Sequence, residues 1–233
     1  MKIAIFGDSW AWSCFEKLPD FQEKPTDLTF QQMFKDYGLI ANSYAIPGGS
    51  NLDTLNQIQK YSKEYDTLIV FQTDPIRQWF DNDDRLHLNL KNNLELPEAN
   101  NFKELCERVL QNFYHQLEKL TSEHKILLIG GCAKLSFDHV PKRFITLSQS
   151  WTELVTPGFT DNYYYWMGPT LALYEHARKK LNWNSALSDF FEFEKEIKNK
   201  NFIWQNSDNF SWCHAAEPAY VAMFEKIKEL LEK

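Results

Sequence analysis

The sequence predicts an α/β protein, a three-layer α/β/α domain built on a parallel sheet, from two observations. Short apolar runs with strand character alternate along the chain with stretches of helical periodicity. Helices of this length between strands are the crossover connections of a parallel sheet, which carries helices on both of its faces. The chain has 233 residues, of which 43% are hydrophobic and 15% aromatic, and it shows no repeat, linker or low-complexity tract. Residues 1–233 are therefore expected to form a single domain.

Three strands are predicted in the first third of the chain. Residues 1–6 form an apolar, partly β-branched run that ends at a glycine, which is typical of a strand followed by a sharp turn. A helical segment over 30–37 leads to the second strand, 39–45. The stretch 52–64 has helical periodicity and leads to the third strand, 67–71, whose pattern is that of a buried strand. Each strand is thus separated from the next by a helix.

The remainder of the chain supplies two more strands and two more helices. Residues 102–123 place their apolar side chains on one helical stripe: Leu105, Val109, Leu110, Phe113, Leu117 and Leu120. A fourth strand over 125–131 follows directly, 143–147 forms a fifth, and a helix over 218–231 closes the chain. In such folds ligands bind at the carboxyl ends of the strands, so the loops after the first three strands are expected to converge on one crevice.

Composition excludes several classes of protein. The net charge is −7 with scattered Lys and Arg, so no nucleic-acid footprint is present, and no apolar run approaches the length of a membrane span. The four cysteines are far apart without CxxC spacing, and the first strand begins at the N-terminus, so we expect a cytoplasmic protein with reduced thiols and no signal peptide: Cys14, Cys106, Cys132 and Cys213. No grouping of residues has zinc spacing, and the acidic run 81–84 is interpreted as an exposed turn.

A candidate nucleophile follows the first strand in the run Gly7-Asp8-Ser9. The glycine allows a sharp turn, and the serine then lies where a helix would begin, with free N–H groups that favour developing negative charge. A nucleophilic serine needs a base, and His214 near the C-terminus is the candidate. The simpler alternatives are a helix N-cap for Ser9 and a polar turn residue for His214.

On these residues the chain resembles the SGNH (GDSL-type) hydrolase family, which comprises serine esterases and lipases with a flavodoxin-like sheet. The block at residues 7–9 matches the first family block, and Ala45–Asn51 matches the second, with Gly48 the better alignment to its oxyanion-hole glycine and Gly49 also possible. The resemblance spans nearly the whole chain. It implies attack by Ser9, with His214 as general base and then acid, and no metal or cofactor.

Two positions depart from the family pattern. The third block normally supplies an oxyanion Asn after the third strand, and this chain has Asp74 there. An ionised Asp would repel the developing charge, so the side chain of Asn51 or Gln72 is considered as a substitute donor. The fourth block, Asp-x-x-His, carries Ser211 instead of the carboxylate. We expect Asp208, three residues further back, to support the histidine, with the Ser211 hydroxyl as the alternative.

The resemblance implies a hydrolase that removes an acetyl or short acyl group from a carbohydrate or small metabolite, with a small-molecule ester as its partner. The alternative is a catalytically weakened fold that serves as a glycan- or protein-binding module. Trp10, Trp12 and the aromatic segment 162–167 could line a pocket or fill the core. Arg77 is interpreted as a solvated helix residue. The Ser9–His214 distance and a carboxylate on the imidazole distinguish the two functions.

Overall fold

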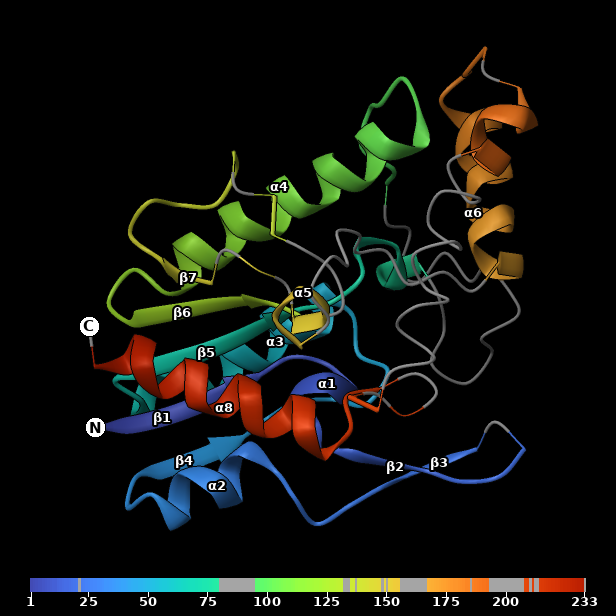
Figure 1. Ribbon diagram of the computed structural model, residues 1–233. Helices are drawn as coiled ribbons and strands as arrows, with labels where there is room; N and C mark the ends of the chain where they lie inside the picture. The colour runs from blue at the N-terminus through green and yellow to red at the C-terminus, as the bar shows by residue number, and fades with distance from the viewer. Residues whose placement is uncertain are drawn as a thin grey trace.

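The chain is described by a computed structural model. It covers residues 1–20, 22–79, 95–131, 135–136, 138–147, 149, 151–155, 167–184, 186–192, 208–209, 211 and 214–232. Its centre is a sheet of five parallel strands (Figure 1), namely β1 (Lys2–Phe6), β4 (Ile40–Ser43), β5 (Thr67–Gln72), β6 (Lys125–Gly130) and β7 (Ile145–Thr146).

The order of the strands across the sheet is β4-β1-β5-β6-β7. Counted along the chain, the sheet strands therefore lie in the order 2-1-3-4-5, the flavodoxin-like order of a doubly wound sheet. The order reverses between β1 and β5, and ligands of such folds bind outside the carboxyl ends of the strands at this switch point. The predicted α/β fold class is confirmed.

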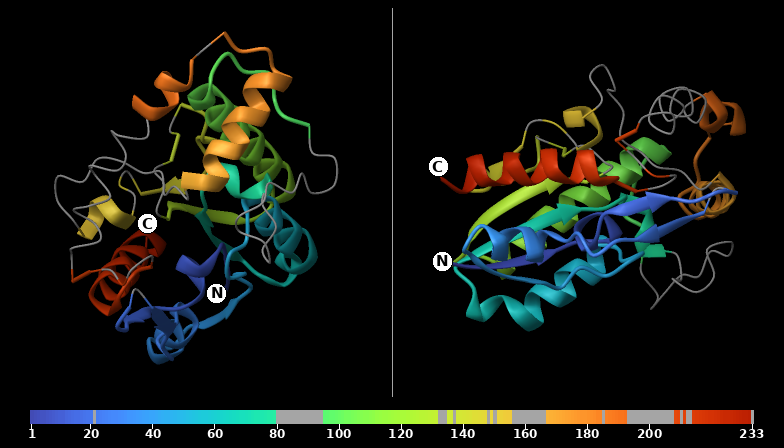
Figure 2. Two further views of the ribbon diagram at one scale, coloured as in Figure 1. Left: turned by 90° about the vertical axis from the view of Figure 1, so that its right-hand side faces the viewer. Right: turned by 60° about the horizontal axis from the view of Figure 1, so that its bottom comes forward.

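Helices cover both faces of the sheet, as its mostly apolar and buried central strands require. On one face lie α2 (Phe30–Asp36) and α8 (Glu217–Leu231), and on the other lie α3 (Asn51–Tyr61) and α4 (Phe102–Leu120). Figure 2 shows α8 and α3 on opposite sides of the sheet. Because side chains alternate along a strand, Ile5 of β1 packs toward α8 while Phe6 packs toward α3 and α4.

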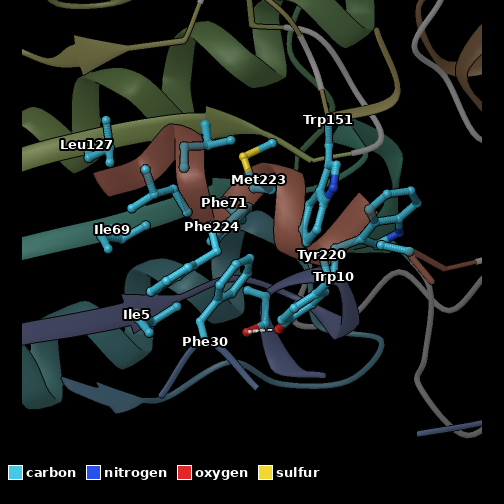
Figure 3. Packing of buried hydrophobic residues seen from close by; sticks show 14 of the residues in the cluster. Ile5, Trp10, Phe30, Ile69, Phe71, Leu127, Trp151, Tyr220, Met223 and Phe224 are labelled. Atoms are coloured by element: carbon cyan, nitrogen blue, oxygen red, sulfur yellow. Dashed lines mark hydrogen bonds between the residues drawn. The ribbon is translucent and has the colours of Figure 1, made fainter. Parts of the chain in front are cut away.

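Aromatic side chains fill the layer beneath α8 (Figure 3). The Phe30 ring stacks on Tyr220 with centroids 4.1 Å apart, and Trp10 meets Trp151 edge to face at 5.3 Å. The indole N–H of Trp151 donates to the carbonyl oxygen of Ala219 at 2.9 Å. Trp10 is thus a core residue.

Several elements had no counterpart among the predicted ones. They are the antiparallel hairpin β2 (Phe15–Lys17) and β3 (Glu23–Pro25), the 3-10 helix η2 (Pro75–Trp79), α5 (Trp151–Val155) and α6 (Met167–Lys180). The helix α1 (Ser9–Trp12) begins at the serine where a helix was expected, and the 3-10 helix η1 (Ser62–Glu64) ends the predicted helical segment 52–64. In Figure 1 the hairpin extends from the end of the sheet opposite to the N-terminus. The expected strands 39–45 and 143–147 are shorter than predicted, because they form the two sheet edges and only part of each pairs with a neighbour.

A separate apolar cluster joins the first half of α4 to α6, and its members include Phe102, Leu105, Tyr174 and Trp183. Cys14 and Cys106 are buried and free, while Cys132 and Cys213 lie outside the described residues. Among the helices that the structure describes, none combines the length and apolar character needed to cross a membrane.

Candidate active site

The turn after β1 places Ser9 at the first position of α1. Gly7 has a φ of 150°, and a Cβ there would lie 2.8 Å from the Cβ of Phe71 and 2.9 Å from that of Ala11. Only glycine fits so close an approach of two segments. Asp8 then caps the helix, because its Oδ1 accepts a hydrogen bond from the N–H of Trp10 at 3.0 Å.

Ser9 and His214 meet although 205 positions separate them in the sequence. The Ser9 Oγ lies 2.7 Å from the Nε2 of His214, within the range required of a nucleophile and its general base. The imidazole is also stacked on the ring of Phe15, with centroids 4.0 Å apart and planes at 15°. Phe15 belongs to β2, so the hairpin fixes the plane of the imidazole.

The carboxylate beside the imidazole comes from Glu23 on β3 and not from Asp208. Glu23 Oε1 contacts the Nδ1 of His214, and its Oε2 accepts a hydrogen bond from the hydroxyl of Ser211. Asp208 is exposed. The expectation for Asp208 assumed that the loop before His214 curls so that Asp208 reaches the imidazole. In the structure Glu23 of the hairpin contacts the Nδ1 atom instead.

The turn after β4 distinguishes the two candidate glycines. The N–H of Gly49 donates to the carbonyl oxygen of Ile46 at 2.8 Å, and Gly48 has a φ of 72°, which with Pro47 before it makes a type II turn. The Gly49 N–H is therefore already bonded. Within the part of the chain that the structure describes, the N–H groups of Gly48 and Ser9 have no acceptor. The turn is tied to the β1 loop, because the Ile46 N–H donates to the Gly7 carbonyl oxygen at 2.9 Å.

The loop after β5 is held by Asn51 and Asp8. The Nδ2 of Asn51 donates to the Thr73 carbonyl oxygen at 3.1 Å, and its Oδ1 accepts from the Thr73 N–H at 3.0 Å. The Thr73 hydroxyl donates to Asp8 Oδ2 at 2.6 Å, and Arg77 Nη1 lies 3.5 Å from the same oxygen. The interpretation of Arg77 as a solvated residue was wrong, because its side chain is only 22% exposed and pairs with a buried carboxylate.

Asp74 lies at the carboxyl end of β5, as the sequence indicated, and is buried. Its Oδ1 accepts a hydrogen bond from the N–H of Ile76 at 2.9 Å, which caps η2. Burial raises the pKa of Asp74 to about 6, and the negative charge of Asp8 adds to the rise, while the Ile76 N–H and Arg77 oppose it. At neutral pH Asp74 is thus mostly ionised. Gln72 accepts a hydrogen bond from the hydroxyl of Tyr114.

The remaining polar and aromatic segments lie in an exposed turn or fall outside the residues that the structure describes. Asp138 and His139 are exposed in a turn. The acidic run 81–84 and the aromatic segment 162–166 lie outside the described residues. Among the residues that are described, no three His, Cys, Asp or Glu side chains are placed to hold a metal ion.

Sequence reasoning missed Glu23 and Phe15, both of which reach the site from the hairpin. The available signal was weak: two three-residue segments on either side of Pro19-Asp20, a dipeptide common in turns. Asp20 has a φ of 57° at this turn, a conformation that Asp tolerates better than most residues.

No family model matches the chain, and no curated protein does either. Among solved structures, a lipase/acylhydrolase from Enterococcus faecalis is 13% identical, with 98% of this chain and 95% of that chain covered and a TM-score of 0.42. A catalytic mutant of an acetylxylan esterase from Geobacillus stearothermophilus is 11% identical, covering 99% and 93%, with a TM-score of 0.41. A family 3 carbohydrate esterase from Clostridium thermocellum is 12% identical, covering 99% and 97%, with a TM-score of 0.38. These likenesses are too loose to assign a function.

Proposed function

We propose that this chain is a serine ester hydrolase of the SGNH type. The observation that carries the proposal is the hydrogen-bonded series Ser9–His214–Glu23, which unites a nucleophile, a base and a carboxylate on the far nitrogen of that base. A serine that served only as a helix cap would not require a histidine at 2.7 Å from its hydroxyl.

The proposed reaction is a two-step acyl transfer. Ser9 Oγ attacks the carbonyl carbon of the ester while His214 Nε2 accepts the hydroxyl proton. The C–O bond to the alcohol then breaks, and the imidazolium returns the proton to the departing oxygen. A water molecule hydrolyses the acyl-enzyme by the same path in reverse order. Glu23 keeps the proton of the neutral imidazole on Nδ1 and stabilises the imidazolium when it forms.

Two main-chain donors are proposed to hold the oxyanion, the N–H groups of Ser9 and Gly48. Both lack an acceptor among the residues that the structure describes. An ionised Asp74 supplies no donor, and one missing donor lowers the rate by about 10²–10³-fold in well-studied cases. We therefore expect a slower enzyme than one with a complete oxyanion hole.

The narrower proposal concerns the substrate, an acetyl or short acyl ester of a carbohydrate or small metabolite in the cytoplasm. Its carbohydrate part is supported by Trp12, which is 36% exposed and lies three residues after Ser9. Its ring centroid is 6.3 Å from that of Phe15, which covers the imidazole. A partly exposed indole on the same helix as the nucleophile suits the apolar face of a sugar ring.

The alternative, a binding module, is favoured by one observation, the buried carboxylate of Asp74 where a donor is expected. The test is hydrolysis of p-nitrophenyl acetate and butyrate by the wild type and by Ser9→Ala and His214→Ala. Ser188→Ala and His139→Ala are matched controls, since both residues are exposed. The esterase requires that the first two variants lose at least 10³-fold in kcat while the controls keep full activity. A folded wild type no faster than Ser9→Ala would support the binding module.

A further inference from the structure

Position 211 has lost the charge that the Asp-x-x-His pattern would place there, yet it remains part of the site. Ser211 is fully buried, and its main-chain N–H donates to the carbonyl oxygen of His214 at 2.8 Å. This bond joins the main chains of the two residues. The Ser211 hydroxyl contacts the carboxylate that touches the imidazole, and it also lies 3.2 Å from the His214 carbonyl oxygen.

The carboxylate of Glu23 bridges Ser211 and His214. Its Oε1 contacts His214 Nδ1, and its Oε2 accepts from the Ser211 hydroxyl. A carboxylate that accepts a hydrogen bond at each oxygen is held in one orientation, and charge-assisted bonds of this kind are stronger than neutral ones. Each of the two oxygens therefore has a distinct role. Oε1 orients the imidazole of His214, and Oε2 fixes the Glu23 carboxylate through the Ser211 hydroxyl.

The hairpin is docked on His214 and Ala215 by its first strand. The Phe15 N–H donates to the carbonyl oxygen of Ala215 at 3.0 Å, and the Phe15 ring covers the imidazole. Glu23 lies on the second strand, where it pairs in register with Lys17. The reach of the Glu side chain, one methylene longer than Asp, spans the gap between a strand outside the main sheet and the Nδ1 atom.

We infer that the hairpin supplies the orienting charge of this site through Glu23, that Ser211 positions this carboxylate, and that a carboxylate at position 211 could take its place. The inference rests on the proposed function, since it assigns roles within that same site. The site requires one negative charge beside His214 Nδ1, and a carboxylate at position 23 or at position 211 can supply it. Two carboxylates there would repel each other, so a charge at both positions is harmful.

The inference is tested by removing the charge at position 23 and adding a charge at position 211, first separately and then together. Glu23→Gln is expected to lower kcat for p-nitrophenyl acetate by about 10³–10⁴-fold with little change in KM. Ser211→Asp alone is expected to lower kcat as well, whereas Glu23→Gln combined with Ser211→Asp recovers at least tenfold over Glu23→Gln. Glu16→Gln is the matched control, since Glu16 is on the same hairpin and its side chain is 56% exposed.

The positioning role of Ser211 has its own test. Ser211→Ala is expected to lower kcat about tenfold, and Ser211→Thr, which keeps the hydroxyl, is expected to retain most of it. A residue that served only packing would behave in the opposite way, because Ala fits a buried serine site more easily than Thr does. Equal kcat values for Ser211→Ala and the wild type would overturn this part of the inference.

An NMR measurement separates failure of the inference from failure of the proposed function. A proton on His214 Nδ1 bonded to a carboxylate gives a strongly downfield resonance, which is expected in the wild type and lost in Glu23→Gln, whatever the activity. If that resonance depends on Glu23 but no ester is hydrolysed, the positioning holds and the proposed function fails. If the wild type hydrolyses esters while Glu23→Gln keeps full kcat, the function holds and the inference is overturned.

Discussion

Two regions bring the candidate catalytic side chains together, and they are built very differently. Ser9 comes from the carboxyl edge of the sheet, meaning the loops that follow β1, β4 and β5. These loops are joined by buried hydrogen bonds from Thr73 to Asp8 and between Asn51 and Thr73. Glu23 comes from the β2–β3 hairpin, whose two strands have three residues each and whose Glu16–Lys24 ion pair is exposed.

Substitutions in these two regions are expected to affect different properties: the stability of the fold at the carboxyl edge, and catalytic activity in the hairpin. At the carboxyl edge the side chains that shape the site also join the loops after the strands through buried contacts, so substitutions there are expected to change the stability of the fold. A two-stranded hairpin is marginal by itself and contributes little to the stability of a sheet to which it does not belong. Substitutions in the hairpin are therefore expected to lower activity while leaving unfolding almost unchanged.

The largest effect on stability is expected for Gly7→Ala. The new Cβ would lie 2.8 Å from the Cβ of Phe71, at a positive φ of 150°. Overpacking and backbone strain together should lower the free energy of unfolding by about 2–5 kcal/mol, measured by urea denaturation. Gly38→Ala is the control, because its φ is 83° but no atom lies within 4 Å of the added carbon. An equal loss in both variants would show that close packing at Gly7 is unimportant.

The second prediction concerns the pH dependence of stability. The pKa of Asp74 is raised in the folded state, so the Asp74 carboxyl of the unfolded chain loses its proton at a lower pH than that of the folded protein. Between about pH 4 and about pH 6 the folded protein therefore binds this proton more strongly than the unfolded chain does. Stability is therefore lost over that window, and the rise from 3.8 to about 6 corresponds to about 3 kcal/mol. Asp74→Asn, which keeps an oxygen for the Ile76 N–H, should be more stable than the wild type by about this amount at pH 7.

The same difference in unfolding free energy should fall to less than about 1 kcal/mol near pH 4, where the wild-type carboxyl is protonated in the folded state and about half ionised in the unfolded state. Urea denaturation at pH 4, 5, 6 and 7 measures it. Asp27→Asn provides the comparison, since Asp27 is exposed. A gap between Asp74→Asn and the wild type that does not change with pH would contradict the prediction.

The smallest effect is expected in the hairpin. Phe15→Leu removes the ring that stacks on His214 but keeps an apolar side chain. An aromatic stack is worth about 0.5–1.5 kcal/mol, so loss of the imidazole orientation should lower kcat by up to about tenfold with a similarly small change in unfolding. Lys24→Ala, at an exposed site on the same hairpin, should leave kcat unchanged. A variant Phe15→Leu with wild-type kcat and reduced stability would make Phe15 a packing residue only.

The sequence by itself determined what is local or follows from topology. The apolar run of β1 and the glycine after it predict a strand and a turn, and a parallel sheet must bring the loops after its strands to one edge. The order of strands and turns along the chain therefore suffices to assign Ser9, Gly48 and Asp74 to that edge. The pairing of Ser9 with His214 was predicted from the family resemblance, and the structure places the two within hydrogen-bond distance.

Only the tertiary structure decided which carboxylate meets the imidazole. Glu23 and His214 are 191 positions apart, and the segments that carry Glu23 are too short to show a period. Their position depends on contacts with the loop before α8, through Phe15 and Ser211, and not on their own propensities. Asp208 was expected because it is near His214 in sequence, but nearness along a loop does not fix a side chain. A hairpin docked from elsewhere in the chain does.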